Sequence, residues 1–319
     1  MTTPVALLLP GQGSQYPRMA AGLYRTEPVF TDSVEEVFAL LGPAGDDVRA
    51  DWLSDDPVVP LAHPTRSQIL LFAVDYAISR QIMSWGVRPA ALLGHSAGEL
   101  VAATLAGVFA LADAVELLWD RVNRLEHAPP GGMLAVAGNP EQVSRYLGDG
   151  VVVGAVNSPS QVILAGPSGP LDRVAATLSA DGVMCRAVPT TVGFHSPMLA
   201  AQAEETLPLV EKIGMAPPRI PLYSGYTTTR LTDLEVADAR LWASHMVAPV
   251  LFWPALSTLL ADGDFRLVEA GPGQALATVA RRHPAVTRGG SSVYAASPPR
   301  ALGASADVAA LRKLAGALA

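Results

Sequence analysis

The 319-residue chain is poor in several residue types, and each shortage excludes a class of protein. It has one cysteine, Cys185, so it can form neither an internal disulfide nor a cysteine-based zinc site. Charged residues make up only 16% of the chain, against about a quarter in typical domains, and half of the residues are hydrophobic. A chain with this much apolar material can bury a large core, which excludes intrinsic disorder.

Long apolar runs and a basic leader are also missing. The run Ile69–Val74 is far shorter than the ~20 residues that span a bilayer. The first residues, Met1–Pro10, lack the basic stretch of a signal peptide. A net charge of −7 argues against a nucleic-acid partner. We therefore expect a soluble, cytoplasmic protein that binds neither membrane nor nucleic acid.

Strands and helices alternate in the first part of the sequence. Val5–Leu9 and Pro89–Leu93 are short apolar runs that each end at a glycine turn, as buried parallel strands do. This alternation predicts an α/β fold with a doubly wound parallel sheet. The helices are expected at Ser67–Trp85, Gly98–Ala106 and Ala112–Leu125.

The middle of the chain has a different pattern, which begins after the Pro129–Gly132 breaker. Its elements follow the order β-α-β-β-α-β, which is typical of a ferredoxin-like α+β unit. We predict that residues 131–190 form this small subdomain, inserted into a core made of residues 1–130 and 191–319. The elements are strands at Met133–Val136, Val151–Val156, Gln161–Ala165 and Met184–Ala187, with helices at Pro140–Leu147 and Pro170–Asp181.

After the insertion the sequence returns to the pattern of the core. A glycine-rich turn, Gly271–Gly273, follows one of its strands, and the last ~20 residues are rich in Ala and Leu, which favours a helix. The other elements expected here are helices at Met198–Ile213 and Asp238–Met246 and strands at Ile220–Ser224 and Arg266–Glu269.

The segment Gly94–Gly98, with the sequence GHSAG, fits the G-x-S-x-G elbow of serine enzymes. It follows a predicted strand and precedes a predicted helix, which is the context that the motif requires. The sharp turn would lift Ser96 out of the sheet, and the helix N-terminus would offer N–H groups to an oxyanion. Ser96 is therefore a candidate nucleophile.

A serine nucleophile needs a base, and the chain has six histidines. His95 is adjacent to Ser96 on the turn, so we expect it to pack into the fold and bond to a neighbouring backbone group. His195 lies in a loop after the small subdomain, where it can reach the elbow. From the residues alone the base is His195, His63, His245 or His283.

Five motifs together resemble the malonyl-CoA:acyl-carrier-protein transacylase family, which includes the acyltransferases of polyketide synthases. The resemblance runs from about Val5 to His283, and it implies a hydrolase-like core with a ferredoxin-like insert. In order, the motifs are Pro10–Gln15 (PGQGSQ), Gly94–Glu99 (GHSAGE), Asn157–Pro159 (NSP), Phe194–Pro197 (FHSP) and Glu269–Gly273 (EAGPG).

The resemblance implies roles for the residues at matching positions. Ser96 would be the acylated nucleophile and His195 its base, with the N–H groups of Gln12 and Ala97 as the oxyanion hole. A main-chain carbonyl orients the histidine in this family, and the matching position here is His245, whose ring could alternatively couple to His195. Two further residues, Gln68 and Asn157, would line the substrate site.

Specificity is implied by residues further along the chain. Arg121 matches the arginine that pairs with the free carboxylate of malonyl-type groups, and Arg124 is its competitor three residues on. Phe194 is typical of relatives that use malonyl. Gly193, in contrast, departs from the common malonyl signature and would leave room for a larger acyl group.

The resemblance predicts transfer of malonyl from coenzyme A to the phosphopantetheine thiol of an acyl carrier protein, by a discrete enzyme of fatty-acid or polyketide synthesis. No metal or other cofactor is needed. A transferase between two carrier proteins, an editing thioesterase and an inactive docking protein are the alternatives, and the last is disfavoured because Ser96 and His195 are both present. The basic cluster Arg281–His283 (RRH) would dock the acidic carrier protein through Arg281 and Arg282.

Overall fold

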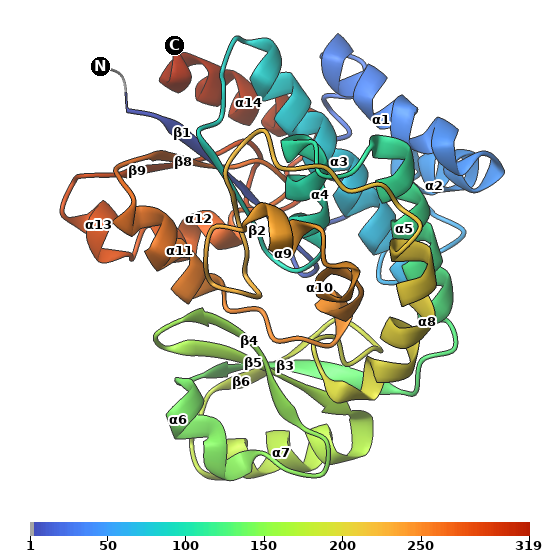
Figure 1. Cartoon of the computed structure of the whole chain (residues 1–319), viewed down its shortest axis with the longest axis vertical. Coiled ribbons are helices and arrows are strands. Elements are labelled where there is room, and N and C mark those ends of the chain that lie inside the picture. Colours follow the sequence, from blue (N-terminus) through green and yellow to red (C-terminus); the bar gives the residue numbers. More distant parts are fainter. Residues whose placement is uncertain (1–2) are drawn as a thin grey trace.

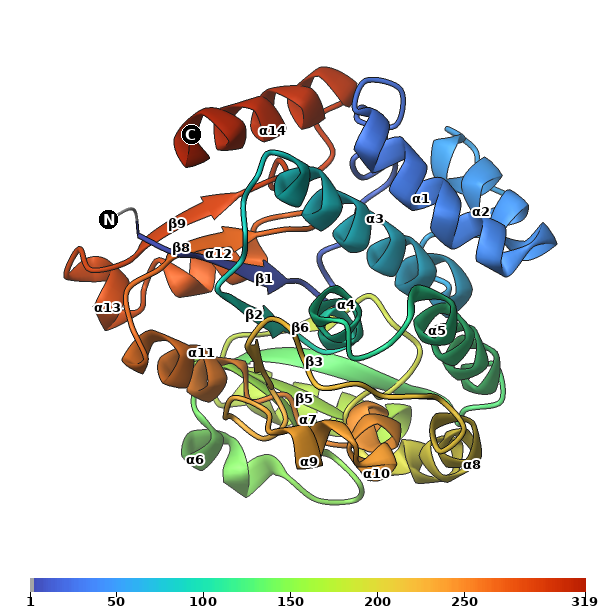
Figure 2. The same cartoon turned by 45° about the horizontal axis from the view of Figure 1, so that its top comes forward.

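The computed structural model describes residues 3–319 and contains two β-sheets (Figures 1 and 2). The larger sheet has five parallel strands in the order β7-β2-β1-β8-β9, and the smaller has four antiparallel strands in the order β4-β5-β3-β6. This arrangement confirms the predicted fold class. The strands are β1 (Val5–Leu9), β2 (Ala91–Gly94), β3 (Gly131–Ala137), β4 (Val152–Ser158), β5 (Gln161–Pro167), β6 (Cys185–Val188), β7 (Leu222–Tyr223), β8 (Arg266–Glu269) and β9 (Ser292–Ala295).

Helices cover both faces of the parallel sheet, which explains why its strands are continuous apolar runs. Leu7 and Leu9 of β1 belong to the apolar cluster that includes α1, α3, α4, α5 and α14, whereas Leu8 belongs to the cluster on the opposite face with α11 and α12. The larger helices are α1 (Pro28–Leu41), α2 (Pro43–Leu53), α3 (Pro64–Ser84), α4 (Ala97–Ala106), α5 (Leu111–Leu125), α8 (Ala200–Val210), α11 (Phe252–Ala261) and α14 (Ala304–Leu318). The short helices of this part are α9 (Asp233–Val236), α10 (Ala239–Ala243), α12 (Ala275–Ala280) and α13 (Pro284–Thr287).

The smaller sheet has the ferredoxin-like strand order, and all of its strands lie within residues 131–188. Leu134 and Leu164 pack against α7 (Ser168–Ala180), which lies with α6 (Pro140–Val143) on the outer side of this sheet (Figure 1). The opposite face, with Ala155 and Ile163, joins the apolar cluster under the larger sheet. The two sheets therefore share one buried boundary, while the division at residues 131 and 190 stays a prediction.

Several predicted elements are shorter in the structure. The helix expected at Asp238–Met246 is α10 followed by a 3-10 turn at Ser244–Met246, and the strand expected at Ile220–Ser224 keeps only β7. The helix expected at Pro140–Leu147 likewise splits into α6 and a 3-10 turn. No sequence pattern singled out α1, α2, α11 or β9.

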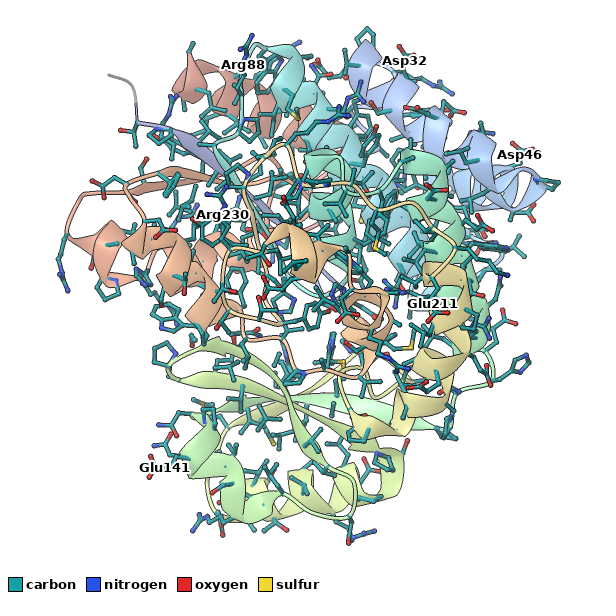
Figure 3. The ribbon with its side chains drawn as sticks, viewed as in Figure 1. Asp32, Asp46, Arg88, Glu141, Glu211 and Arg230 are labelled. Carbon is teal, nitrogen blue, oxygen red and sulfur yellow. The ribbon has the colours of Figure 1, made fainter. Side chains whose placement is uncertain are left out.

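Charged side chains, including Asp46, Glu141 and Glu211, project from the outer surface of the molecule (Figure 3). In the part of the chain that the structure describes, no helix has both the length and the apolar character needed to cross a membrane.

Candidate functional site

Ser96 lies on a strained turn between β2 and α4. Its backbone angles are φ 54° and ψ −120°, a conformation that non-glycine residues rarely adopt. The flanking glycines serve a different purpose, because neither has a positive φ. A Cβ on Gly98 would overlap the carbonyl of Leu9, and one on Gly94 would overlap the backbone of Glu99. The motif thus needs glycine for close backbone approach, and the strain falls on the serine.

His195 stands opposite Ser96, with its Nε2 atom 2.6 Å from the serine Oγ. The Nδ1 atom lies 3.0 Å from the carbonyl oxygen of Ala248, and the backbone N–H of His195 donates to Met246. Since Nδ1 must carry the proton to donate to a carbonyl, Nε2 presents its lone pair to the serine. A main-chain carbonyl therefore orients the ring, but the acceptor is Ala248, three residues beyond the expected position 245.

Burial, with a smaller contribution from the nearby His95, lowers the pKa of His195 to about 4. Hydrogen bonding to the carbonyls of Ala248 and His245 acts in the opposite direction but is the weaker effect. The imidazole is thus neutral at pH 7 and able to accept a proton.

The other candidate histidines have different partners. His63 pairs through Nδ1 with Thr65 at 2.7 Å, and His283 pairs through Nε2 with Ser257 at 3.2 Å. The structure therefore brings His195 to the serine and leaves these two elsewhere.

His95 packs into the fold as expected, but its partner is a side chain. Its Nε2 atom lies 2.8 Å from Oδ1 of Asn157, and its ring lies 5.6 Å from that of Phe252. His95 and Asn157 both line a channel of about 230 Å³ that reaches Ser96 and His195. Asn157 is thus placed to line the route to the serine.

The turn after β1 packs directly on the serine elbow, because β1 and β2 are neighbours in the parallel sheet. The N–H of His95 donates to Leu9 at 2.9 Å, and a Cβ on Gly11 would overlap the carbonyl of His95. Within residues 3–319, the N–H groups of Gln12 and Ala97 donate to no protein acceptor. The two expected oxyanion donors are therefore both free, one on each side of the elbow.

A small cavity of about 40 Å³ lies beside Ser96 and His195. We call it the acyl cavity. It gathers most of the residues that the sequence analysis singled out. The lining consists of Gln12, Gln68, Ser96, Ala97, Arg121, Leu125, Phe194, His195, Tyr226, His245 and Met246.

Arg121 contributes a buried cation to the acyl cavity. The residue is only 8% exposed, its Nη2 donates to the carbonyl of Trp242 at 2.6 Å, and its Nε has no partner among the described residues. Burial lowers the pKa of Arg121 to about 10, so the guanidinium stays protonated at pH 7. Arg124 instead forms ion pairs with Asp120 and Glu205 outside the cavity. The structure thus places Arg121, and not Arg124, at the site.

The side-chain amide of Gln12 also lacks partners. Both its Oε1 and its Nε2 are buried, and neither makes a hydrogen bond within residues 3–319. Together with the Nε of Arg121, these atoms form an unsatisfied polar end in the acyl cavity. Since buried polar groups are nearly always paired, this arrangement indicates a polar ligand.

Gly193 lines neither the acyl cavity nor the channel, so the expectation that it leaves room for a larger acyl group is wrong. A Cβ at this position would lie 2.5 Å from Sδ of Met198 and 2.8 Å from the carbonyl oxygen of Gly166. Glycine is needed here because two backbone segments touch. Its neighbour Phe194 does line both spaces.

Two residues of the site were not predicted. Tyr226 lies in the loop after β7, and its ring stacks on that of His245 at 3.9 Å between centroids. Glu99 is fully buried and accepts from the N–H of Gly225 at 2.9 Å, while its Oε1 lies 3.9 Å from Nε2 of His245. Glu99 follows the serine motif directly, which is a usable signal, whereas no motif marks Tyr226.

Glu99 and His245 are a neutral pair at pH 7. Burial raises the pKa of Glu99 to about 8 and lowers that of His245 well below its usual value, with Arg121 adding to the second shift. The ring of His245 stacks on that of Tyr226 and lies 5.0 Å from that of Trp242. The nearby His195 also lowers the pKa of His245, so the two histidines influence each other electrostatically, as the alternative from the sequence allows.

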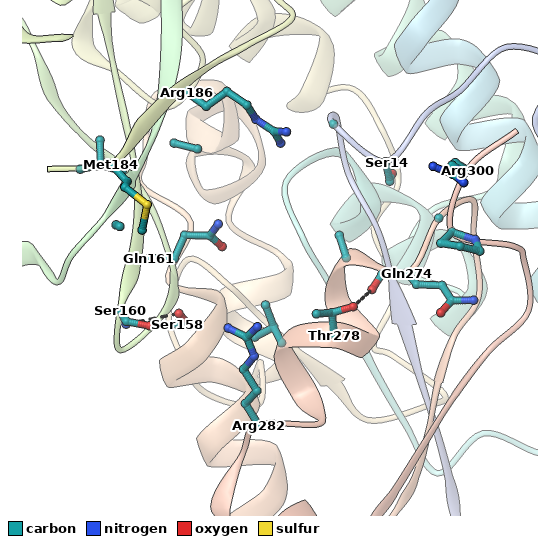
Figure 4. Close-up of a pocket in the computed structure, with 18 of the residues that line it drawn as sticks. Ser14, Ser158, Ser160, Gln161, Met184, Arg186, Gln274, Thr278, Arg282 and Arg300 are labelled. Carbon is teal, nitrogen blue, oxygen red and sulfur yellow. Dashed lines mark hydrogen bonds between the residues drawn. The ribbon is translucent and has the colours of Figure 1, made fainter. Parts of the chain in front are cut away.

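A groove of about 770 Å³ opens between the smaller sheet and α12 (Figure 4). Arg186, Arg282 and Arg300 line it, and none of them forms an ion pair with another residue in the range 3–319. The groove shares lining residues, including Gln161, with the channel that reaches Ser96. Arg281 is exposed but lies outside the groove lining.

Comparison with known proteins matches residues 7–297 to the acyl transferase domain family. The chain belongs to this family. This acyltransferase is 37% identical over 281 residues to a phenolphthiocerol/phthiocerol polyketide synthase protein of Mycobacterium tuberculosis, a match that covers 88% of the chain and 19% of that protein. The chain therefore spans less than a fifth of the length of such curated relatives.

Two solved structures place the acyltransferase fold among those of known enzymes. The acyl transferase domain of SpnD in complex with 2-(pent-4-yn-1-yl)malonyl is 33% identical, with a TM-score of 0.90 over 97% of this chain and 74% of that one. An acyl carrier protein S-malonyltransferase from Vibrio cholerae is 26% identical, with a TM-score of 0.82 over 98% of this chain and 100% of that one. The protein is thus an acyltransferase of the polyketide-synthase and FabD kind.

Proposed function

We propose that this acyltransferase moves a malonyl or related carboxyacyl group from coenzyme A to the phosphopantetheine thiol of an acyl carrier protein, in polyketide or fatty-acid synthesis. The observation that carries the proposal is the buried guanidinium of Arg121 in the acyl cavity beside Ser96. A buried cation is costly without an anion, and a planar guanidinium binds a carboxylate through two hydrogen bonds. The acyl group should therefore end in a carboxylate.

In the first half-reaction Ser96 Oγ attacks the thioester carbonyl, and its proton moves to Nε2 of His195. The oxyanion forms between the N–H groups of Gln12 and Ala97, whose free state supports this role. Collapse of this intermediate breaks the C–S bond, and the departing sulfur takes the proton from Nε2. The acyl group is then an ester on Ser96, and coenzyme A leaves as a thiol.

In the second half-reaction the pantetheine thiol of the carrier protein replaces coenzyme A. Nε2 of His195 accepts the thiol proton, and the thiolate attacks the ester carbonyl. The C–O bond then breaks, and Ser96 Oγ recovers the proton from Nε2. The same two residues thus serve both directions of transfer.

The basic residues of the groove support coenzyme A and the carrier-protein prosthetic group as the two substrates. Coenzyme A and the carrier prosthetic group share a pantetheine arm and a phosphate, and the groove offers Arg186, Arg282 and Arg300 without acidic partners. The channel of about 230 Å³ between groove and serine is the route for the arm. Arg281, exposed beside the groove, remains a proposed contact for the acidic surface of the carrier.

Intact-mass spectrometry after incubation with malonyl-CoA and acetyl-CoA tests the function. We expect a malonyl mass increase on the wild type and none on Ser96→Ala, while the matched control Ser179→Ala, on the exposed face of α7, keeps the label. Acylation only by a loaded carrier protein would favour the carrier-to-carrier transferase, and rapid release of free malonate would favour the thioesterase. An undiminished label on Ser96→Ala would place the nucleophile elsewhere.

A further inference from the structure

The acyl cavity is small for a pocket that must hold the end of a substrate. Its volume of about 40 Å³ is space for roughly three water-sized groups, at ~10–15 Å³ each. A carboxylate on a single CH₂ fills such a space, and a branched chain overfills it. Something in the lining therefore restricts the cavity, and its walls are the place to look.

Tyr226 supplies one of these walls. The residue sits in the loop that follows β7, where its N–H donates to Oγ of Ser224 at 3.0 Å. The loop is closed by further bonds, including one from Ser224 N–H to the carbonyl of Thr229 at 3.0 Å. The backbone that carries Tyr226 is thus held at both sides of the residue.

The ring of Tyr226 is held as well. It stacks on His245 at 3.9 Å with 13° between the planes, and its centroid lies 6.1 Å from that of the His195 ring. His245 is itself buried and lies 5.0 Å from the ring of Trp242. The tyrosine ring is therefore backed by a second ring that is itself buried and packed.

We propose that Tyr226 is the residue that sets the size limit of the acyl group. Its stacked ring forms one wall of the acyl cavity, which Gln12 and Arg121 also line, so the site takes a malonyl group and rejects carboxyacyl groups with an alkyl branch. This inference rests on the function proposed above. It attributes the discrimination between malonyl and branched carboxyacyl groups to the volume of the tyrosine ring. The hydroxyl of Tyr226 is not required for it.

The test compares Tyr226→Val, which gives up the ring, with Tyr226→Phe, which keeps it. The measured quantity is the ratio of kcat/KM for malonyl-CoA to that for ethylmalonyl-CoA, with the carrier protein as acceptor. One methylene in an apolar pocket changes such a ratio by ~10–200-fold. We expect Tyr226→Val to lower the ratio at least tenfold and Tyr226→Phe to keep it within about threefold.

Thermal melting accompanies the assay, and Tyr226→Leu replaces the valine variant if the latter does not fold. His245→Asn removes the base of the stack and should lower the ratio in the same direction. An unchanged ratio in a folded valine or leucine variant would overturn the inference, as would an equal loss in Tyr226→Phe. Failure of the wild type to take malonyl at all would instead refute the proposed function.

Discussion

Replacing Arg121 with alanine should reverse the acyl preference of the enzyme. The guanidinium keeps one bond to the carbonyl of Trp242 and has its Nε free in the acyl cavity. A malonyl carboxylate would accept the remaining hydrogen bonds of the Arg121 guanidinium, whose residue is only 8% exposed. Loss of such a desolvated charge-assisted contact costs about 2–4 kcal/mol, or roughly 30- to 1000-fold in kcat/KM.

Acetyl-CoA has no carboxylate, so the same variant should transfer acetyl at the wild-type rate or faster. An acetyl group in the wild type leaves the cation of Arg121 buried and unpaired, and alanine removes that cost. The assay measures kcat/KM for both donors with one carrier protein. We expect kcat/KM to fall for malonyl-CoA and to stay level or rise for acetyl-CoA. General destabilisation of the protein would instead lower both values.

Arg124→Ala is the matched control, because it removes an arginine from the same helix, one turn away. Its guanidinium pairs with Asp120 and Glu205 on the outer side, so both transfer rates should stay within about twofold of the wild type. The reasoning is refuted if Arg121→Ala slows malonyl and acetyl transfer by one common factor. It is equally refuted if the wild type already prefers acetyl.

Three further predictions follow from the same geometry. His195→Ala should slow both half-reactions by ~10²–10⁴-fold in stopped-flow assays. The rate of wild-type acylation should stay level from pH 8 to about 5.5 and fall at lower pH, because the His195 ring, whose pKa is about 4, takes up a proton. A pH–rate profile with its midpoint near pH 7 would contradict a neutral imidazole. Burial raises the pKa of Glu99 to about 8, above its value in the unfolded chain. The protonated Glu99 side chain therefore contributes its full stabilisation at acid pH, and this stabilisation is lost as the pH rises through 8. The midpoints of urea unfolding at pH 5.5 and 8.5 should differ less in Glu99→Gln than in the wild type. Reversing the charge of Arg282, which lines the groove shared by both substrates, should raise KM for coenzyme A thioester and carrier protein alike. Reversing the charge of Arg281 should raise KM only for the carrier protein. Equal effects of the two changes would show that Arg281 and Arg282 do not have separate roles.

The parts of the site that could be predicted are those that local chemistry requires. Ser96 and its flanking glycines form a turn whose geometry is set within five residues, and the turn containing Gln12 follows the neighbouring strand of the same sheet. The parallel pairing of β1 and β2 in the structure brings these two turns together. Arg121 is different, because apolar spacing predicts its helix, whereas its place in the site is implied only by the resemblance to the family.

The rest of the site depends on irregular segments that only the tertiary structure positions. Tyr226 lies in a loop with no periodic pattern, and the carbonyl that orients His195 comes from Ala248, just beyond a short 3-10 turn. Gly193 shows the converse error, because a glycine in the sequence looks like free space and in the fold marks a contact between two backbones. Sequence patterns therefore predict which residues belong to a site, whereas only the packed structure shows whether there is free space beside them.

The backbone at Ser96 and His195 has a consequence for the stability of the protein. Both residues have φ near +60°, at 54° and 61°, where a side chain costs of order 1 kcal/mol or more and glycine costs little. The best-folding residue at position 96 is thus one that cannot be acylated. Glycine at position 96 would relieve this strain and at the same time remove the proposed nucleophile, so the serine serves the proposed transfer at a cost to the stability of the fold.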